Sequence, residues 1–383
     1  KTVTVNPLPA PTITGNNNVC VGATGVNYTT EASMSGYLWS VSSGGIIASG
    51  GTTNSILVNW NIVGPQSVSV NYTIPATGCS ATSPASKAIT VNPLPVPSIT
   101  GPAQVCAGSA GNVYTTESGM TNYLWTVSAG GSISSGGGTS SNTVTVTWNA
   151  TGAQSVSVNY TNSNTCTAAS PVTKAITVNP LPAPGLTGPV SACNGSTGNV
   201  YTTETGMTNY LWAVSPGGNI TAGGGTSNNT ATVTWNGTTP QSVSVNYQNS
   251  AGCTALNPAV KNVTINPLPV PTLTGQASSC EGSAGVIYNT EAGMTNYLWA
   301  TSSGGTITSG SGTNSISVSW FLPGSQSVSV NYTNSNGCTA NAATSKSVNV
   351  APLPGAAGTI TGNAAVCAGS TGIPYSVAAI ANT

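Results

Sequence analysis

Cysteine is the residue type with the most chemistry in this sequence. The chain of 383 residues holds nine cysteines, at two positions that recur about every 87 residues. Each full repeat therefore contains two cysteines that could form a disulfide, bind a metal ion or remain free thiols. The first position is occupied by Cys20, Cys106, Cys193, Cys280 and Cys367, and the second by Cys79, Cys166, Cys253 and Cys338.

A disulfide within each repeat is the arrangement that the sequence favours. Two cysteines without a histidine or a CxxC pair do not supply the four ligands of a structural metal site, while free thiols remain an alternative. The first cysteine lies near the first strand and the second precedes the last strand, and these strands are neighbours in a two-sheet sandwich. Closing a loop of about 60 residues would stabilise each domain by roughly 4 kcal/mol. The predicted pairs are Cys20–Cys79, Cys106–Cys166, Cys193–Cys253 and Cys280–Cys338, with Cys367 left without a mate.

Acid–base chemistry has few candidate residues. The chain has no His, no Asp and no Arg, and its charged residues are five Lys and five Glu. A catalytic triad, a carboxylate pair and a calcium site all need residues that are missing, so we predict no enzyme activity, no catalytic residue, no cofactor and no metal ligand. One covalent alternative stays open. Lys174 shares strand parity with Ile176, as in surface sandwiches that join a buried Lys to an Asn through an amide bond.

The low charge excludes two classes of partner. Charged residues make up 3% of the chain and the net charge is zero, which excludes nucleic-acid binding and a basic membrane patch. No apolar run approaches the roughly 20 residues that span a bilayer, so we predict no membrane span in this segment. The chain starts just before a proline cluster and stops early in a repeat, which indicates a piece of a longer array.

The repeat from Pro93 to Val178 shows the fold class. Gly-rich segments at 128–138 and 161–165 are typical of turns, and no stretch has a helical period. About seven short strands in such a repeat predict an all-β fold, a sandwich of two sheets. Five stretches alternate apolar with small polar residues, as half-buried strands do, at 112–117, 122–128, 142–149, 154–161 and 174–179.

Each full repeat also carries two tryptophans on the strand faces of its inward valines. This parity predicts core positions, and a platform for stacking sugars is the alternative. The predicted core residues are Trp39, Trp60, Trp125, Trp148, Trp212, Trp235, Trp299 and Trp320.

A proline cluster follows the last strand of each repeat without a Gly or Ser spacer. Proline fixes its own φ and restrains the residue before it, so we predict short, extended, semi-rigid joints in which the central leucine packs on the adjoining domain. The predicted joint residues are Pro7, Leu8, Pro9, Pro93, Leu94, Pro95, Pro180, Leu181, Pro182, Pro267, Leu268, Pro269, Pro352, Leu353 and Pro354. The implied domains are the end of a preceding repeat at 1–8, full repeats at 9–94, 95–181, 182–268 and 269–353, and a partial repeat at 354–383.

The motifs "YLWTVSAGG", "TVTVTWN", "QSVSVNYTNSNGCTA" and "VNPLPAPTITG" resemble the PKD-like, immunoglobulin-like repeats of very large surface proteins of Bacteroidota. Proteins with such repeats include adhesins exported by the type IX secretion system, among them the gliding-motility adhesin of flavobacteria. The resemblance implies a tandem array of immunoglobulin-like β-sandwich domains that forms an extended rod. The chain departs from the acidic "WDFGDG" motif of ordinary PKD domains, so any role of those acids is absent.

Two functions are compatible with this sequence. The first is a structural stalk or filament segment of a surface adhesin, whose partners are neighbouring repeats of the same chain and identical chains in a fibre. The second is a multivalent array that binds surface glycans. Loop segments 46–54 and 132–142 contain no aromatic residue, which weakens the second function. Disulfides imply an oxidising compartment, so we predict an extracellular or cell-surface location.

Overall fold

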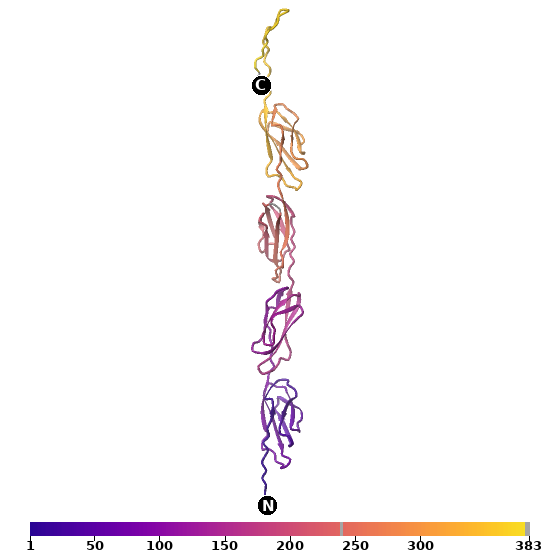
Figure 1. Ribbon diagram of the computed structural model, residues 1–383, viewed down its shortest axis with the longest axis vertical. Coiled ribbons are helices and arrows are strands. Elements are labelled where there is room, and N and C mark those ends of the chain that lie inside the picture. The colour runs from indigo at the N-terminus through magenta and orange to yellow at the C-terminus, as the bar shows by residue number, and fades with distance from the viewer. Residues whose placement is uncertain (238–239, 380–383) are drawn as a thin grey trace. The chain divides into compact units, whose positions relative to one another are not determined.

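The computed structural model describes residues 1–237 and 240–379, which form β-strands, turns and no helix (Figure 1). The strands gather into four separate sandwiches in chain order, which we call repeats 1 to 4. The last four residues of the expected partial repeat 354–383 lie outside the described residues. The all-β tandem arrangement predicted from the sequence is confirmed.

Repeat 2 illustrates the two-sheet topology. One sheet has the strand order β11-β14-β15-β9 and the other the order β10-β13-β12. Strand β9 pairs with β15 in parallel, and the other pairings of this repeat are antiparallel. The strands are β9 (Gln104–Cys106), β10 (Asn112–Thr115), β11 (Thr121–Val127), β12 (Gly131–Gly136), β13 (Thr143–Trp148), β14 (Gly152–Thr161) and β15 (Val172–Asn179).

The other three repeats use the same topology, and repeats 1 and 4 have one more short strand at the edge of the sheet that has three strands in repeat 2. Repeat 1 comprises β1 (Thr14–Gly15), β2 (Asn18–Cys20), β3 (Val26–Thr29), β4 (Ser35–Val41), β5 (Gly45–Ser49), β6 (Ser55–Trp60), β7 (Gly64–Thr73) and β8 (Ala85–Asn92). Repeat 3 comprises β16 (Ser191–Cys193), β17 (Asn199–Thr202), β18 (Thr208–Val214), β19 (Gly218–Gly223), β20 (Thr230–Trp235), β21 (Gln241–Gln248) and β22 (Ala259–Asn266). Repeat 4 comprises β23 (Thr274–Gly275), β24 (Ser278–Cys280), β25 (Val286–Asn289), β26 (Thr295–Thr301), β27 (Gly305–Ser309), β28 (Ser315–Trp320), β29 (Gly324–Thr333) and β30 (Thr344–Ala351).

The core of each sandwich is built from the alternating residues of its strands. In repeat 2, Val144, Val146 and Trp148 of β13 are fully buried, and so are Val156 and Val158 of β14. All eight tryptophans are buried, which confirms the predicted core positions. The outward positions hold mainly Ser, Thr and Asn, so hydroxyl and amide groups rather than charges hydrate the surface.

One predicted turn region contains a strand. The Gly-rich segment 128–138 forms β12, which pairs with β13 from Gly131↔Trp148 to Gly136↔Val144. A side chain on Gly131 would collide with the indole of Trp148, because a Cβ there would lie 2.6 Å from the ring. Gly131 is therefore required because the large core tryptophan reaches the backbone of this strand, whereas Gly136 has φ of 69° and a Cβ there would collide with the carbonyl O of Thr143.

The chain divides into two compact units. The first comprises Lys1–Pro182 together with Ala251–Cys253, and the second comprises Ala183–Ser250 and Thr254–Thr383. Repeats 1 and 2 thus lie in the first unit, and a short turn of repeat 3 belongs with them.

Candidate functional site

The candidate functional site is the joint between successive repeats, and the first cysteine of each repeat lies at the end of the sandwich where the chain leaves. In repeat 2, Cys106 ends β9 opposite Asn179, the last residue of β15. The amide N of Ala107 donates to the carbonyl O of Asn179 at 2.9 Å, and that of Gly108 donates to Trp148 O at 2.7 Å. Cys106 is therefore fixed beside the proline cluster that begins at Pro180.

The second cysteine lies at the opposite end of the sandwich. Cys166 belongs to the turn between β14 and β15, and its side chain is fully buried. The amide of Cys166 donates to Asn162 Oδ1 at 3.0 Å, and the amide of Asn164 donates to the same oxygen at 3.0 Å. Such an Asx turn holds the cysteine in one orientation next to the point where the chain enters the repeat.

The predicted pairing within repeats is wrong. The two cysteines of repeat 2 lie near opposite ends of β14, whose ten residues span roughly 30 Å. A disulfide needs its Cα atoms about 4.4–6.8 Å apart. The predicted pairs Cys20–Cys79, Cys106–Cys166, Cys193–Cys253 and Cys280–Cys338 are therefore not formed. The disulfides are instead Cys20–Cys166, Cys106–Cys253 and Cys193–Cys338, each with a Cα–Cα distance of 5.6 Å, and Cys79, Cys280 and Cys367 are free thiols.

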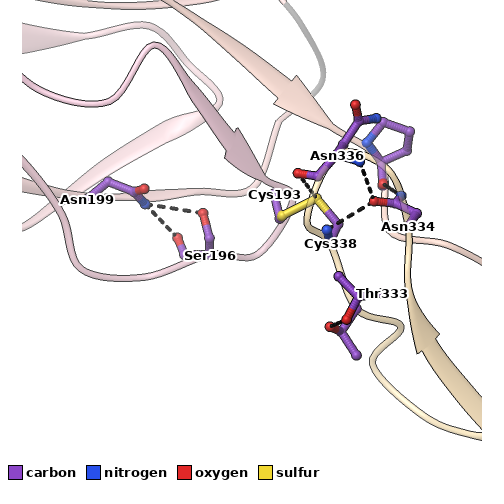
Figure 2. Close-up of a disulfide and its surroundings, with 9 residues drawn as sticks. Cys193, Ser196, Asn199, Thr333, Asn334, Asn336 and Cys338 are labelled. Carbon is purple, nitrogen blue, oxygen red and sulfur yellow. Dashed lines mark hydrogen bonds between the residues drawn. A yellow bond between two sulfur atoms is a disulfide. The ribbon is translucent and has the colours of Figure 1, made fainter. Parts of the chain in front are cut away.

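Each disulfide thus joins the exit end of one repeat to the entry end of the next. Figure 2 shows the third bridge, in which Cys193 at the end of β16 meets Cys338 in the turn before β30. Asn334 accepts hydrogen bonds from the amides of Asn336 and Cys338, both at 3.0 Å. The Nδ2 of Asn334 also donates to the carbonyl of Pro267 at 3.4 Å, so the same turn holds both the bridge and the proline cluster.

The proline cluster lies against the repeat that follows it. Leu268 and Pro269 border a hollow whose far wall is the segment 340–344, and Thr344 Oγ1 donates to Pro271 O at 2.7 Å. Leu94, Leu181 and Leu268 are half-buried, whereas Leu8 and Leu353, in the first and last clusters, are 54% and 56% exposed. The role of these leucines in setting the joint remains a prediction.

A glutamate in each repeat holds the chain just after the prolines. In repeat 2, the amide N of Ser98 donates to Glu117 Oε2 at 3.2 Å, and Ser98 Oγ donates to Oε1 at 2.6 Å. Thr116 Oγ1 and the hydroxyl of Tyr160 donate to Oε2 at 2.7 and 2.9 Å. The same arrangement links Glu31 to Thr12, Glu204 to Gly185 and Glu291 to Thr272. No local sequence pattern around the glutamates predicts this role, although each glutamate follows its partner by 19 residues.

These contacts change the acidity of the groups involved. Burial alone would raise the pKa of Glu117, but hydrogen bonds from Ser98 and Thr116 outweigh it and lower the pKa to about 2. The pKa of Glu31, Glu204 and Glu291 is likewise lowered to about 2. Burial raises the pKa of Tyr160 to about 12, and the hydrogen bond to Glu117 contributes. The carboxylates therefore stay ionised, as acceptors, at all ordinary pH values.

We expect this glutamate contact to weaken only in strong acid. A carboxyl whose pKa is lower in the folded state contributes stability above its unfolded pKa, here 4.5, and loses it as the pH falls toward about 2. The amide proton resonance of Ser98 should therefore titrate near pH 2 in NMR spectra. Glu117→Gln should abolish that titration and leave those of Gly185 and Thr272 in place. A titration of Ser98 near pH 4.5 would contradict the assignment.

The cysteine turn of repeat 2 contains an unfavourable residue. Thr165 has φ of 61°, where the corresponding residues of the other repeats are Gly78, Gly252 and Gly337 with φ of 70–77°. A β-branched residue in this left-handed region costs roughly 1–2 kcal/mol. Thr165→Gly should therefore stabilise repeat 2 by about 1 kcal/mol in urea unfolding followed by hydrogen exchange. Gly337→Thr, the reverse change, should destabilise repeat 4, and equal signs for the two variants would refute the explanation.

The lysines and acids form no further site in the described part of the chain. Lys174 is half-buried on β15. Glu117, the recurrent acid of that repeat, accepts bonds from Ser98, Thr116 and Tyr160. Within residues 1–237 and 240–379, no group of three or more Cys and Glu could hold a metal ion, and no helix could cross a membrane.

The model of one protein family matches the chain four times. The description of that family is "PKD-like domain", and the matches cover residues 6–90, 92–175, 179–261 and 266–350. The chain belongs to the PKD-like domain family. Each match covers most of one sandwich, so the joints described above connect successive PKD-like domains.

Comparisons of the whole chain give weaker likenesses. The bacterial integrin-binding protein invasin is 13% identical with a TM-score of 0.32, over 92% of this chain and 81% of invasin. The ICAM-5 D1–D4 fragment is 14% identical with a TM-score of 0.33, over 89% of this chain and 99% of the fragment. The Escherichia coli adhesin FdeC is 17% identical with a TM-score of 0.28, over 68% of this chain and 100% of FdeC. No curated protein matches the sequence.

Proposed function

We propose that this chain is a stalk segment of a large extracellular bacterial adhesin, which holds a binding region away from the cell. One observation carries the proposal. At three successive junctions, each PKD-like repeat is joined to the next by a disulfide in addition to the peptide chain. A linker that served only to connect independent binding domains would not need a second covalent connection at each junction.

The other features of the joint support the same function. The proline cluster restricts the backbone between repeats, and the glutamate fixes the chain where it enters the following repeat. Disulfides persist in oxidising surroundings, which supports the cell surface as the location. The resemblance of the motifs to repeats of type IX secreted adhesins of Bacteroidota supports that group, and gliding motility, as the biological setting.

Small-angle X-ray scattering of the oxidised chain tests the stalk. We expect the scattering of an elongated particle, with a maximum dimension several times the diameter of one sandwich. Leu268→Ser should broaden the distribution of distances, since it removes an apolar side chain from the hollow that Leu268 lines together with segment 340–344, while the domains stay folded. A compact particle would overturn the proposal. Antibody labelling of intact, unpermeabilised cells of the source organism would test the surface location separately.

The buried tryptophans weigh against the alternative function of a glycan-binding array. All eight lie in the cores, so they offer no stacking surface to a sugar. A glycan array probed with the oxidised chain should show no binding. Lateral association into a fibre is a further part of the stalk proposal, and analytical ultracentrifugation over a range of concentrations would detect it.

A further inference from the structure

The pattern of bridges has a mechanical consequence, which depends only on covalent connectivity. We propose that the disulfides Cys20–Cys166 and Cys193–Cys338, together with residues 166–193 between them, form a short covalent path through the array, which we call the strap. The strap carries tension past the body of each sandwich and limits how far the chain can be stretched. The strap does not depend on the identity of the adhesin or on its ligand. Its extensibility is controlled by the oxidation state of the bridges.

The strap is short because each bridge bypasses most of two successive repeats, since its cysteines lie 145–147 residues apart in the sequence. Cys20 is bonded to Cys166, and Cys193, which is bonded to Cys338, follows Cys166 by only 27 residues. Those residues run along β15, through the proline cluster at Pro180 and along β16. A covalent path of this length can reach at most roughly 100 Å, whereas the 318 peptide units from Cys20 to Cys338 could reach roughly 1,100 Å.

A second path runs beside the first one. It passes from Cys106 to Cys253 and then along β22 toward Cys280, again 27 residues after Cys253. The two paths meet in repeat 3 as the parallel strands β16 and β22, with Cys193 opposite Asn266. Because the strands are parallel, tension pulls both in the same direction and does not drive one past the other.

The rest of each sandwich lies outside these paths. In repeat 2, residues 107–165 are connected to these paths only at Cys106 and Cys166, and they include β10 to β14 and the fully buried Trp148. Force applied along the chain therefore does not pull these strands out of the core. A sandwich without the bridges would have to resist the same force through its hydrogen bonds and core packing alone.

Single-molecule force spectroscopy on the whole chain, held at its two ends, tests the strap. The shortest covalent path of the oxidised chain contains roughly 90 of the 383 residues, so its full extension should be about one quarter of that of the reduced chain. With the bridges intact we expect no unfolding step of a whole repeat. Dithiothreitol reduces each bridge to two thiols and is itself oxidised to its cyclic disulfide, and steps of about 25–30 nm per repeat should then appear.

Cysteine variants distinguish the strap from a general effect of oxidation. Cys193→Ser removes the bridge that bypasses most of repeats 3 and 4, so long unfolding steps should return in the oxidised chain. Cys79→Ser and Cys367→Ser remove free thiols only and should leave the force curve unchanged. Whole-repeat steps in the fully oxidised wild-type chain would overturn the proposal, and so would peptide mapping that found Cys20 bonded to Cys79.

Discussion

Replacing Trp148 with alanine is expected to destabilise repeat 2 by about 4 kcal/mol, the range found when a buried aromatic side chain is truncated. The indole is fully buried between the two sheets. Its Nε1 donates to the hydroxyl of Tyr114 at 3.0 Å, and the two rings meet edge to face with centroids 6.3 Å apart. The variant would therefore leave a cavity and a buried tyrosine hydroxyl without its donor.

Hydrogen exchange resolved by mass spectrometry is the suitable measurement, because it reports each repeat separately. Single domains are stable by about 5–15 kcal/mol, so repeat 2 should lose a large share of its protection while repeats 1 and 4 keep theirs. Leu124→Ala is the control in the same repeat, on strand β11 of the other sheet. Leu124 is 65% exposed, and its loss should change stability by less than about 0.5 kcal/mol. Equal effects of the two substitutions would show that Trp148 does not hold the core together.

The strands were predictable because their alternation follows from burial on one face. The stretches 154–161 and 174–179 correspond to β14 and β15, with small differences at the ends. Strand β12 was not predictable in the same way. Its glycines suggest a turn, and the structure explains them one by one: Gly131 faces the indole of Trp148, and Gly136 has a positive φ beside the carbonyl O of Thr143.

The pairing of the cysteines could not be derived from strand adjacency alone. The expectation that the first and last strands are neighbours is confirmed by the pairing of β9 with β15. That pairing is parallel, so it places Cys106 at the end of β15, while Cys166 precedes the start of β15. The direction of the first strand, which apolar alternation does not report, decided whether the sulfurs of one repeat could meet.

The role of the recurrent glutamate could not be predicted from the sequence, for a different reason. Glu117 is near Ser98 only after β10 has folded back, so no local pattern marks the contact. The constant spacing of 19 residues in four repeats is the one sequence signal that pointed to it. Once the joint is known to be ordered, this spacing can be interpreted as a contact between the carboxylate and the residue that follows the proline cluster.

Reduction of the disulfides should destabilise the interior repeats more than the outer ones. Repeats 2 and 3 each contribute two cysteines to bridges, whereas repeats 1 and 4 each contribute one. On the chain-entropy model, a bridge that closes a loop of 146 residues stabilises the folded state by about 5 kcal/mol, shared between the two repeats it joins. Hydrogen exchange before and after reduction should therefore show the largest loss of protection in repeats 2 and 3.

A single variant separates this effect from a general sensitivity to reductant. Cys20→Ser removes one bridge and should lower the protection of repeats 1 and 2 while repeat 4 is unchanged, and Cys79→Ser should change none of them. If the bridges instead held each repeat together internally, Cys20→Ser would affect repeat 1 alone. A loss confined to repeat 1 would therefore contradict the connection between repeats. A loss in both repeats would show that the stability of each sandwich depends on the covalent bond to its neighbour. In the wild-type chain the bridge at Cys166 ties an unfolded repeat 2 to repeat 1 and so restricts its unfolded state, and Cys20→Ser removes that restriction.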